Sequence, residues 1–207
     1  MSKTIEAEIR AFEEMPELKK IREMARERLT EYRYLHTVEV AKRGVMLAHL
    51  YGGNSCKAYR AGLLHDFCKD MPKNEMLALI RQYIPDFEKR QCTWYVSPSL
   101  WHSKAASVYL RYELKETDEE IINAVEYHTS ARAGMSLTEQ IVYLADLTSD
   151  DRNYPDIAEM RRLSEKNIDE AMLYALKYII GELTSKTAVL TAETVEAYNE
   201  YAERVGR

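Results

Sequence analysis

The chain has 207 residues, of which 46% are hydrophobic and 30% charged, and its formal net charge at pH 7 is −5. This length and balance predict one soluble globular domain with enough chain to bury a core. The negative charge argues against a nucleic-acid binder that works by general phosphate attraction, so an anionic substrate would need a local basic cluster.

The first residues and the cysteines bear on where the protein works. Residues 1–15 place acidic side chains among the apolar ones and lack the uninterrupted apolar stretch of a signal peptide. No apolar run approaches the ~20 residues that cross a bilayer, so no membrane association is expected. Cys56, Cys68 and Cys92 follow no metal-finger spacing and are expected to be free thiols. We therefore expect a cytoplasmic protein.

The first half of the chain is predicted to form a series of helices, because the whole chain contains only 7 Gly and 5 Pro, the residues that most often interrupt helices. Helical patterns cover residues 4–13, 16–28, 31–51, 55–65 and 75–84. Pro16 suits a first helical turn, and Thr30 is expected to cap the helix that ends at Gly52-Gly53. Ser55 and Asn74 are expected to open the next two helices.

The second half continues in the same way. The segment Ser97-Pro98-Ser99 is expected to lead into a helix that reaches about Leu114. Two capping boxes, at residues 117–120 and 136–139, predict helices through His128 and Asp146. Residues 167–182 and 187–204 complete the series, and no segment shows sustained period-two alternation. The sequence predicts an all-α chain forming a single domain over residues 1–207.

Polar side chains at the ends of apolar helical runs are the first candidates for a functional site. His65 and Asp66 follow the apolar residues 61–64, His128 ends a similar run, and Asp146 closes residues 141–145. An adjacent imidazole and carboxylate offer the mixed nitrogen and oxygen ligands that suit a divalent transition metal. A carboxylate after such a run is costly to bury unpaired, and either a metal or an arginine would resolve that cost.

Two further histidines become candidate metal ligands because of this pattern. His36 shares a helix face with Val40, Arg43 and Leu47, whereas His49 lies on a different side of the same helix and is left out. His102 begins a predicted helix beside Trp101. A single histidine on such a helix is more often a packed or surface residue than a ligand, so the case depends on the whole set.

The order His36, His65-Asp66, His102, His128, Asp146 resembles the H…HD…D signature of the HD-domain superfamily of metal-dependent phosphohydrolases, in the variant with two added histidines. The surrounding residues resemble the YqeK family over about residues 30–165. The matching segments are Arg33-Tyr34-Leu35-His36, Ala61-Gly62-Leu63-Leu64-His65-Asp66, Leu100-Trp101-His102, Ala124-Val125-Glu126-Tyr127-His128-Thr129 and Ile141-Val142-Tyr143-Leu144-Ala145-Asp146. The resemblance implies a helical HD-type bundle with flanking helices at both ends, which cleaves diadenosine tetraphosphate symmetrically to two ADP.

The resemblance also implies a ligand set for two divalent metal ions. The first ion would be held by His36, His65, Asp66 and Asp146. The second would be held by Asp66, His102 and His128, with Asp66 bridging and so acting in catalysis. Such ligands suit Fe, Mn, Co or Ni, and the family precedent favours iron. A two-metal site supplies a water of lowered pKa that can attack phosphorus, so no serine or cysteine nucleophile is needed.

Four side chains near these motifs are candidates to act on the substrate. Lys69 follows Asp66 by three residues and is expected to contact substrate phosphate and to assist catalysis. Thr129 and Arg152 are expected to bind phosphate, and Arg132 is a weaker candidate because loop arginines usually face solvent. The family commonly has Gly and Pro where this chain has Ala131 and Ala133, which bears on loop shape and substrate preference.

Two other functions stay open at this point. An HD-type phosphatase or phosphodiesterase of a different nucleotide would keep the metals and change the substrate, because one scaffold hosts several activities. A non-catalytic helical binding protein would keep only the fold, but the intact side chains at all six ligand positions argue against it. A homodimer is the assembly considered for either enzyme.

Overall fold

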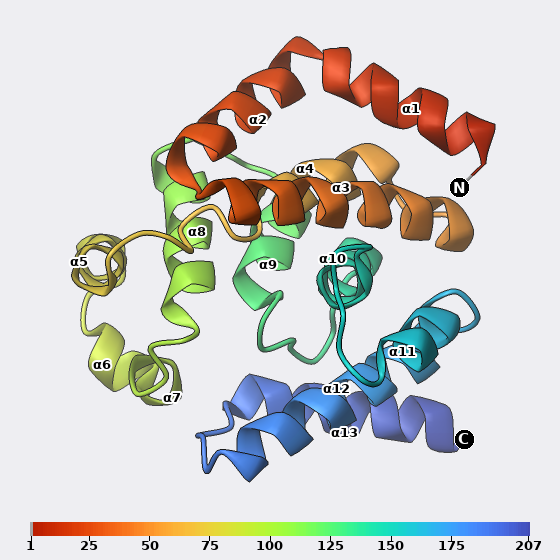
Figure 1. Ribbon diagram of the computed structural model, residues 1–207. Helices are drawn as coiled ribbons and strands as arrows, with labels where there is room; N and C mark the ends of the chain where they lie inside the picture. The colour runs from red at the N-terminus through yellow and green to blue at the C-terminus, as the bar shows by residue number, and fades with distance from the viewer. Residues whose placement is uncertain (1) are drawn as a thin grey trace.

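The computed structural model describes residues 2–207, which form thirteen helices and no strand (Figure 1). This confirms the all-α prediction. The helices are α1 (Lys3–Glu14), α2 (Pro16–Arg28), α3 (Glu31–Tyr51), α4 (Ser55–Leu64), α5 (Lys73–Tyr83), α6 (Phe87–Arg90), α7 (Cys92–Tyr95), α8 (Trp101–Tyr112), α9 (Glu119–Tyr127), α10 (Leu137–Thr148), α11 (Ile157–Ser164), α12 (Ile168–Ser185) and α13 (Ala192–Gly206). Among these described helices, none combines the length and the apolarity that a bilayer crossing requires.

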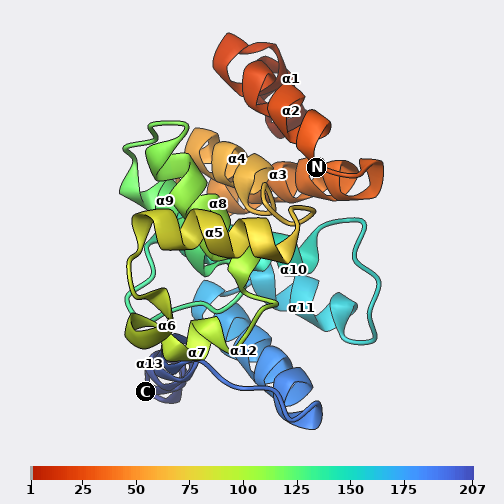
Figure 2. The same ribbon diagram turned by 90° about the vertical axis from the view of Figure 1, so that its left-hand side faces the viewer.

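The centre of the molecule is built from α3, α4, α9 and α10, which pack against one another. Helices α1 and α2 cover α3 and α4 on one side, while α12 and α13 pair on the opposite side below α10 and α11 (Figure 1). Helix α8 packs against α9, and α5 packs against α8 to complete a third side, seen face-on in Figure 2. The central helices are therefore enclosed by the others.

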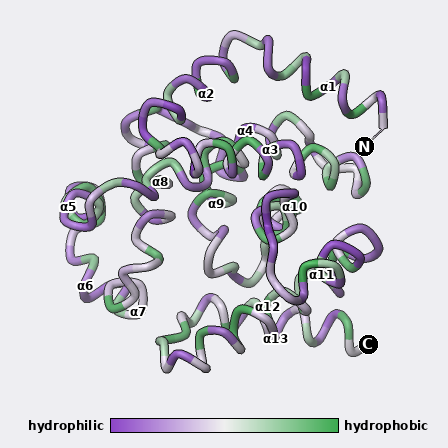
Figure 3. Tube along the Cα trace, in the orientation of Figure 1, coloured by the Kyte–Doolittle hydropathy of each residue, from purple (hydrophilic) through white to green (hydrophobic). Residues whose placement is uncertain are grey.

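The apolar core has two parts that meet at the central helices. One cluster joins α1 and α2 to α4, α5 and α8, and the other joins α10 to α11, α12 and α13. Helix α3 serves both, because Val38, Ala41 and Val45 enter the first cluster and Val40 and Leu47 enter the second. Along most helices, hydrophobic positions that face the core are interspersed with polar positions (Figure 3).

Two glycines let α3 and α4 approach closely. A Cβ atom on Gly62 of α4 would lie 2.7 Å from the Cα and 3.0 Å from the backbone nitrogen of Ala41 on α3. A Cβ atom on Gly44 of α3 would lie 3.2 Å from the carbonyl oxygen of Ala58 on α4. Because Gly62 stands three residues before His65, this contact also fixes how near the end of α4 comes to α3.

We expect Gly62→Ala to lower the free energy of unfolding by about 1–3 kcal/mol, because the added methyl group meets rigid backbone atoms. Gly181→Ala on α12 is the matched control, since a Cβ atom there meets nothing within 4 Å. The control should gain about 0.5–1 kcal/mol from the better helix propensity of alanine. Urea denaturation of both variants measures the difference, and an equally stable Gly62→Ala variant would contradict the close contact.

The predicted helices are present, with differences at several ends. Asn54 rather than Ser55 caps α4, since its side-chain oxygen accepts a hydrogen bond from the backbone N–H of Lys57. Helix α5 begins at Lys73 after Pro72, one residue before Asn74. Asp118, not Thr117, caps α9 through the N–H of Glu120. The predicted capping box of Ser136 and Glu139 is confirmed.

The remaining differences are short or late elements. The last helix begins at Ala192 rather than at 187, because the Thr191 side chain caps it. Helices α6, α7 and α11 span 4, 4 and 8 residues and were not predicted. Elements of one or two turns carry too few periodic positions to stand out in a sequence and are stabilised mainly by tertiary packing.

Candidate metal centre

Six polar side chains meet where the central helices α3, α4, α9 and α10 and helix α8 come together. They are His36 of α3, His65 and Asp66 just after α4, His102 in the first turn of α8, His128 just after α9 and Asp146 in the last turn of α10. The side chains of the first five are at most 4% exposed, and that of Asp146 is 14% exposed. All six predicted metal ligands therefore lie in one buried cluster.

The possible ligand atoms of this cluster form three overlapping sets of three. In each set the atoms lie within 4.8 Å of one another, and the sets are His36, His65 and Asp66; His65, His128 and Asp146; and Asp66, His102 and His128. Asp66 belongs to two of the sets. Its Oδ1 lies 3.2 Å from Nε2 of His102 and 3.5 Å from Nε2 of His128. The side chain of Asp66 thus stands between the two groups of histidines.

Backbone carbonyl groups orient three of the imidazole rings. Nδ1 of His65 lies 2.7 Å from the carbonyl oxygen of Gly62, three residues earlier. Nδ1 of His102 lies 2.8 Å from the oxygen of Ser99, and Nδ1 of His128 lies 2.7 Å from that of Val125. A carbonyl oxygen only accepts, so each Nδ1–H donates and each Nε2 is left as a bare acceptor that faces the cluster.

This arrangement brings acceptor atoms together with no hydrogen between them. Nε2 of His102 lies 3.2 Å from Nε2 of His128, and both face Oδ1 of Asp66. Nε2 of His65 and Oδ1 of Asp66 are buried and have no hydrogen-bond partner. Lone pairs at such separations repel one another, and the Lys69 ammonium, 3.0 Å from Nε2 of His102 and 3.5 Å from Oδ1 of Asp66, offsets this repulsion on one side only. A divalent transition metal, which takes imidazole nitrogen and carboxylate oxygen ligands, fits this donor set.

The protonation states of His65 and His102 agree with this interpretation, whereas for His36 burial lowers the pKa but the hydrogen bond to Asp146 outweighs burial and raises the pKa above its usual value. Burial lowers the pKa of His65 and the pKa of His102 to about 4, so both imidazoles are neutral at pH 7, as metal ligation requires. Burial alone would raise the pKa of Asp146, but the hydrogen bond from His36 and the charge of Arg152 hold it well below its usual value. The cluster therefore carries carboxylate charge at neutral pH.

Three basic side chains surround the cluster. The Lys69 ammonium lies 3.0 Å from Nε2 of His102 and 3.5 Å from Oδ1 of Asp66. The Arg152 guanidinium pairs with the Asp146 carboxylate and lies 3.3 Å from Nε2 of His36. Arg33 lies 3.5 Å from Asp66 on a further side. Lys69 and Arg152 were predicted here, whereas Arg33 was quoted only as part of a motif and given no role.

Asp151 is a member of the site that the sequence reasoning missed. Its Oδ2 lies 2.8 Å from Nδ1 of His36, the one cluster histidine without a backbone carbonyl partner. A carboxylate on the outer nitrogen holds an imidazole ring in one orientation and makes it a better ligand. No sequence spacing indicates this pairing, because His36 and Asp151 are 115 residues apart and meet only when α10 packs on α3.

The two remaining candidates differ in their surroundings. Thr129 follows His128, and its Oγ1 lies 3.2 Å from Oγ of Ser103 at the edge of the cluster. Arg132 makes two hydrogen bonds of 2.7 Å to the carboxylate of the buried Glu139. That pairing gives Arg132 a structural partner in the first turn of α10, and its contact with substrate stays a prediction.

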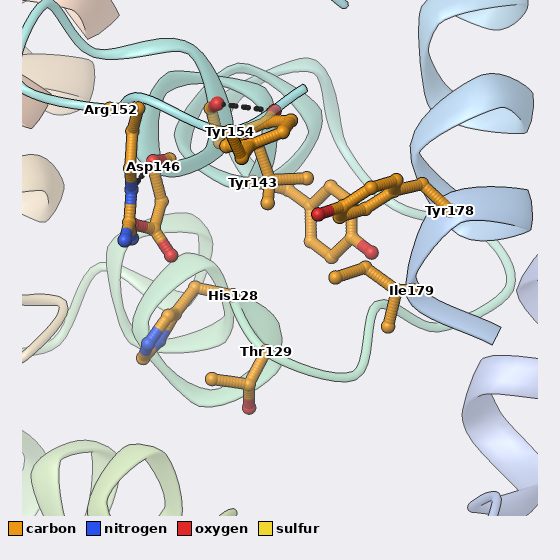
Figure 4. A pocket seen from close by; sticks show the side chains of 9 residues that line it. His128, Thr129, Tyr143, Asp146, Arg152, Tyr154, Tyr178 and Ile179 are labelled. Atoms are coloured by element: carbon orange, nitrogen blue, oxygen red, sulfur yellow. Dashed lines mark hydrogen bonds and ion pairs between the residues drawn. The ribbon is translucent and has the colours of Figure 1, made fainter. Parts of the chain in front are cut away.

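A cavity of about 310 Å³ opens beside the cluster, and Figure 4 shows the side chains around it. Its polar end is formed by His128, Asp146 and Arg152. Its other end is apolar and aromatic and includes Tyr143, Tyr154, Tyr178 and Ile179. The candidate metal centre is therefore reached from a pocket whose volume is typical of small-molecule sites.

Comparison with known proteins places this geometry in a family. The family profile of the HD domain matches residues 33–151. A crystal structure described as a predicted HD superfamily hydrolase involved in NAD metabolism, from Clostridium acetobutylicum, superimposes with a TM-score of 0.81. That protein is 29% identical, and the match covers 90% of this chain and 97% of the other.

Two curated proteins named symmetrical bis(5'-nucleosyl)-tetraphosphatase are similar along most of their length. The Bacillus subtilis protein is 34% identical over 84% of this chain and 91% of its own. The Staphylococcus aureus protein is 28% identical over 89% of this chain and 94% of its own. With the histidine and aspartate cluster in place within the matched residues, the chain belongs to the HD-domain family.

Proposed function

We propose that this protein is a metal-dependent hydrolase that cleaves diadenosine tetraphosphate symmetrically to two ADP. The observation that carries the proposal is the buried group of facing acceptors on His102, His128 and Asp66 together with the unpartnered Nε2 of His65, a donor set that suits divalent metal ions. The substrate comes from the relatives, because proteins named symmetrical bis(5'-nucleosyl)-tetraphosphatase match this chain over most of its length.

The six side chains are proposed to hold two divalent ions. His36, His65, Asp66 and Asp146 would bind the first, and Asp66, His102 and His128 would bind the second, which makes Asp66 the shared ligand. Two such ions would supply a water of lowered pKa and would polarise the phosphate oxygens. The nitrogen and oxygen ligands are compatible with Fe, Mn, Co or Ni, and we propose iron as the native metal.

The basic side chains are proposed to bind the polyphosphate. Lys69 lies beside His102, Arg152 lies beside His36, and Arg33 lies beside Asp66. Three positive charges therefore surround the place where phosphate would bind. Fixed cations around a phosphoryl group neutralise the charge that builds on its oxygens during displacement. Thr129, which lines the cavity, is proposed to donate a hydrogen bond to a phosphate oxygen.

We expect Lys69→Ala to lower kcat/KM for diadenosine tetraphosphate by about 10²-fold, because a charged contact to the transferring phosphoryl group is lost. Lys73→Ala, which removes an exposed lysine four residues later on α5, should change kcat/KM by less than about twofold and serves as the control. Steady-state kinetics and metal content should be measured on both variants. A Lys69→Ala enzyme with full metal content and unchanged kcat/KM would contradict the assigned role.

Product analysis tests the proposed reaction. The protein is loaded anaerobically with Fe²⁺, with Mn²⁺ and Co²⁺ in parallel, and incubated with diadenosine tetraphosphate before the nucleotides are separated by chromatography. ADP as the sole product is the expected result. ATP with AMP would overturn the symmetrical cleavage. A metal-filled protein without turnover would favour a phosphatase or phosphodiesterase of another nucleotide, and a protein that binds no metal would favour a helical binding protein.

We also propose a cytoplasmic location and a homodimeric assembly. The location is supported by the three cysteines, which are free thiols in the described chain and suit a reducing compartment. Light scattering of the purified protein tests the assembly, with twice the mass of the chain as the expected result.

A further inference from the structure

The cavity beside the metal centre changes in character from one end to the other. Asp146 and Arg152 lie at the end that meets the centre, and Tyr143, Tyr154 and Tyr178 line the opposite end. A nucleotide has the same division, since a charged phosphate chain continues into a sugar and a flat aromatic base. The cavity therefore offers each part of a nucleoside diphosphate a surface of matching chemistry.

The aromatic end is held in a fixed geometry. The rings of Tyr154 and Tyr178 stack with centroids 5.1 Å apart and an angle of 29° between their planes. The Tyr154 hydroxyl donates a hydrogen bond of 2.8 Å to the carbonyl oxygen of Leu147, which anchors that ring to the end of α10. Both tyrosines are half-buried and line the cavity, so a planar group could extend their stack.

Tyr143 adds a polar group to this end. Its side chain is only 1% exposed, and its hydroxyl is buried without a hydrogen-bond partner. Figure 4 shows the ring beside Tyr178 and Ile179, with the hydroxyl directed toward that wall of the cavity. A buried hydroxyl left unpaired costs free energy, and a ligand that bonds to it recovers that cost.

We propose that this cavity is a nucleoside subsite, in which Tyr154 and Tyr178 stack against a purine base and the Tyr143 hydroxyl bonds to the base or the ribose. The inference rests on the proposed function and deepens it, because it assigns the part of the protein that recognises the nucleoside. Tyr154 and Tyr178 lie outside residues 33–151, the part matched by the HD-domain profile. The subsite thus combines Tyr143 of α10, inside the matched part, with Tyr154 in the segment after α10 and Tyr178 of α12.

Binding of ADP and of inorganic pyrophosphate tests the subsite, because only ADP carries a nucleoside. Isothermal titration with Mn²⁺ in the buffer should give tighter binding of ADP than of pyrophosphate by the wild-type protein. Tyr178→Ala should weaken ADP binding by about tenfold or more, the size of one lost base–aromatic stack, and leave pyrophosphate binding within about twofold. Tyr178→Phe, which keeps the ring, should bind ADP like the wild type.

Tyr174→Ala is the matched control, because Tyr174 lies one turn earlier on α12, is also half-buried and does not line the cavity. It loses similar packing and should keep its affinity for ADP. Equal loss of ADP affinity in the Tyr174 and Tyr178 variants, unchanged affinity in Tyr178→Ala, or equal loss for ADP and pyrophosphate would each overturn the proposal.

Tyr143→Phe gives a second test that folding defects cannot imitate. Removal of an unpaired buried hydroxyl should leave the melting temperature unchanged or raise it, while ADP affinity falls by about fivefold. Unchanged ADP affinity would remove Tyr143 from the subsite. These titrations do not require turnover. If the protein binds ADP in this way but does not cleave diadenosine tetraphosphate, the nucleoside subsite is supported and the proposed reaction is contradicted.

Discussion

Asp66→Ala is expected to abolish hydrolysis of diadenosine tetraphosphate, with kcat/KM lowered by more than about 10³-fold. Asp66 belongs to two of the three ligand sets, so its loss removes an oxygen from both proposed metal positions. No other carboxylate lies in the set with His102 and His128, which would keep only two imidazole nitrogens. Bound metal should fall with activity, measured by elemental analysis of the same preparation.

Asp150→Ala is the control for this variant. Asp150 is an exposed acid shortly after α10 and belongs to none of the ligand sets, so its removal should preserve both metal content and turnover. The Asp66→Ala protein should fold without metal, because Arg33 and Lys69, the cations beside Asp66, are partly exposed and stay solvated when the carboxylate is removed. Near-normal turnover in a folded Asp66→Ala protein would contradict the site.

Lys104→Ala should lower the free energy of unfolding by about 3 kcal/mol, the lower end of the range for breaking a buried ion pair. The Lys104 ammonium is nearly inaccessible and lies 2.5 Å from Oε1 of Glu126, whose other oxygen accepts a hydrogen bond of 2.9 Å from Ser107. The ammonium also lies 4.4 Å from the centroid of the Trp94 ring. Truncation of the lysine leaves the Glu126 charge in a mostly buried place without its partner.

The double variant Lys104→Met with Glu126→Gln is the informative control, because it removes both charges and keeps most of the volume. It should recover most of the lost stability in urea denaturation, as replacing both members of a buried pair usually does. The pair joins α8 to α9, which carry His102 and lead to His128, so Lys104→Ala should also bind metal more weakly. A loss below about 1 kcal/mol would contradict the importance of the pair.

The main helices could be predicted because each has a sequence signal of its own. Gly52 ends α3 in the left-handed conformation, Pro16 opens α2, and Ser136 with Glu139 forms a capping box. Some errors at helix ends lie where two polar residues compete for one cap, as with Asn54 and Ser55. Both can accept from a helix N–H, and only the path of the chain before the helix decides between them.

The candidate site could be predicted only in part. The six proposed ligand residues are visible in the sequence because they follow a motif order, and the structure places them together. Arg33, Asp151 and the tyrosines of the cavity have no such order, since their roles arise from contacts between distant helices. Tyr178 stands on α12, and nothing in its helical spacing separates it from a packed core tyrosine. The division into an HD core of residues 30–165 and flanking helices stays a prediction.

Metal stoichiometry tests the central claim most directly. The protein should be purified anaerobically, stripped with a chelator, reloaded with Mn²⁺ and analysed for metal per chain, with the Asp66→Ala variant in parallel. The proposed ligand sets predict two ions per wild-type chain and a loss of both tight sites in the variant. A wild-type chain that binds one ion or none, or an Asp66→Ala chain that still binds two, would contradict the two-metal centre.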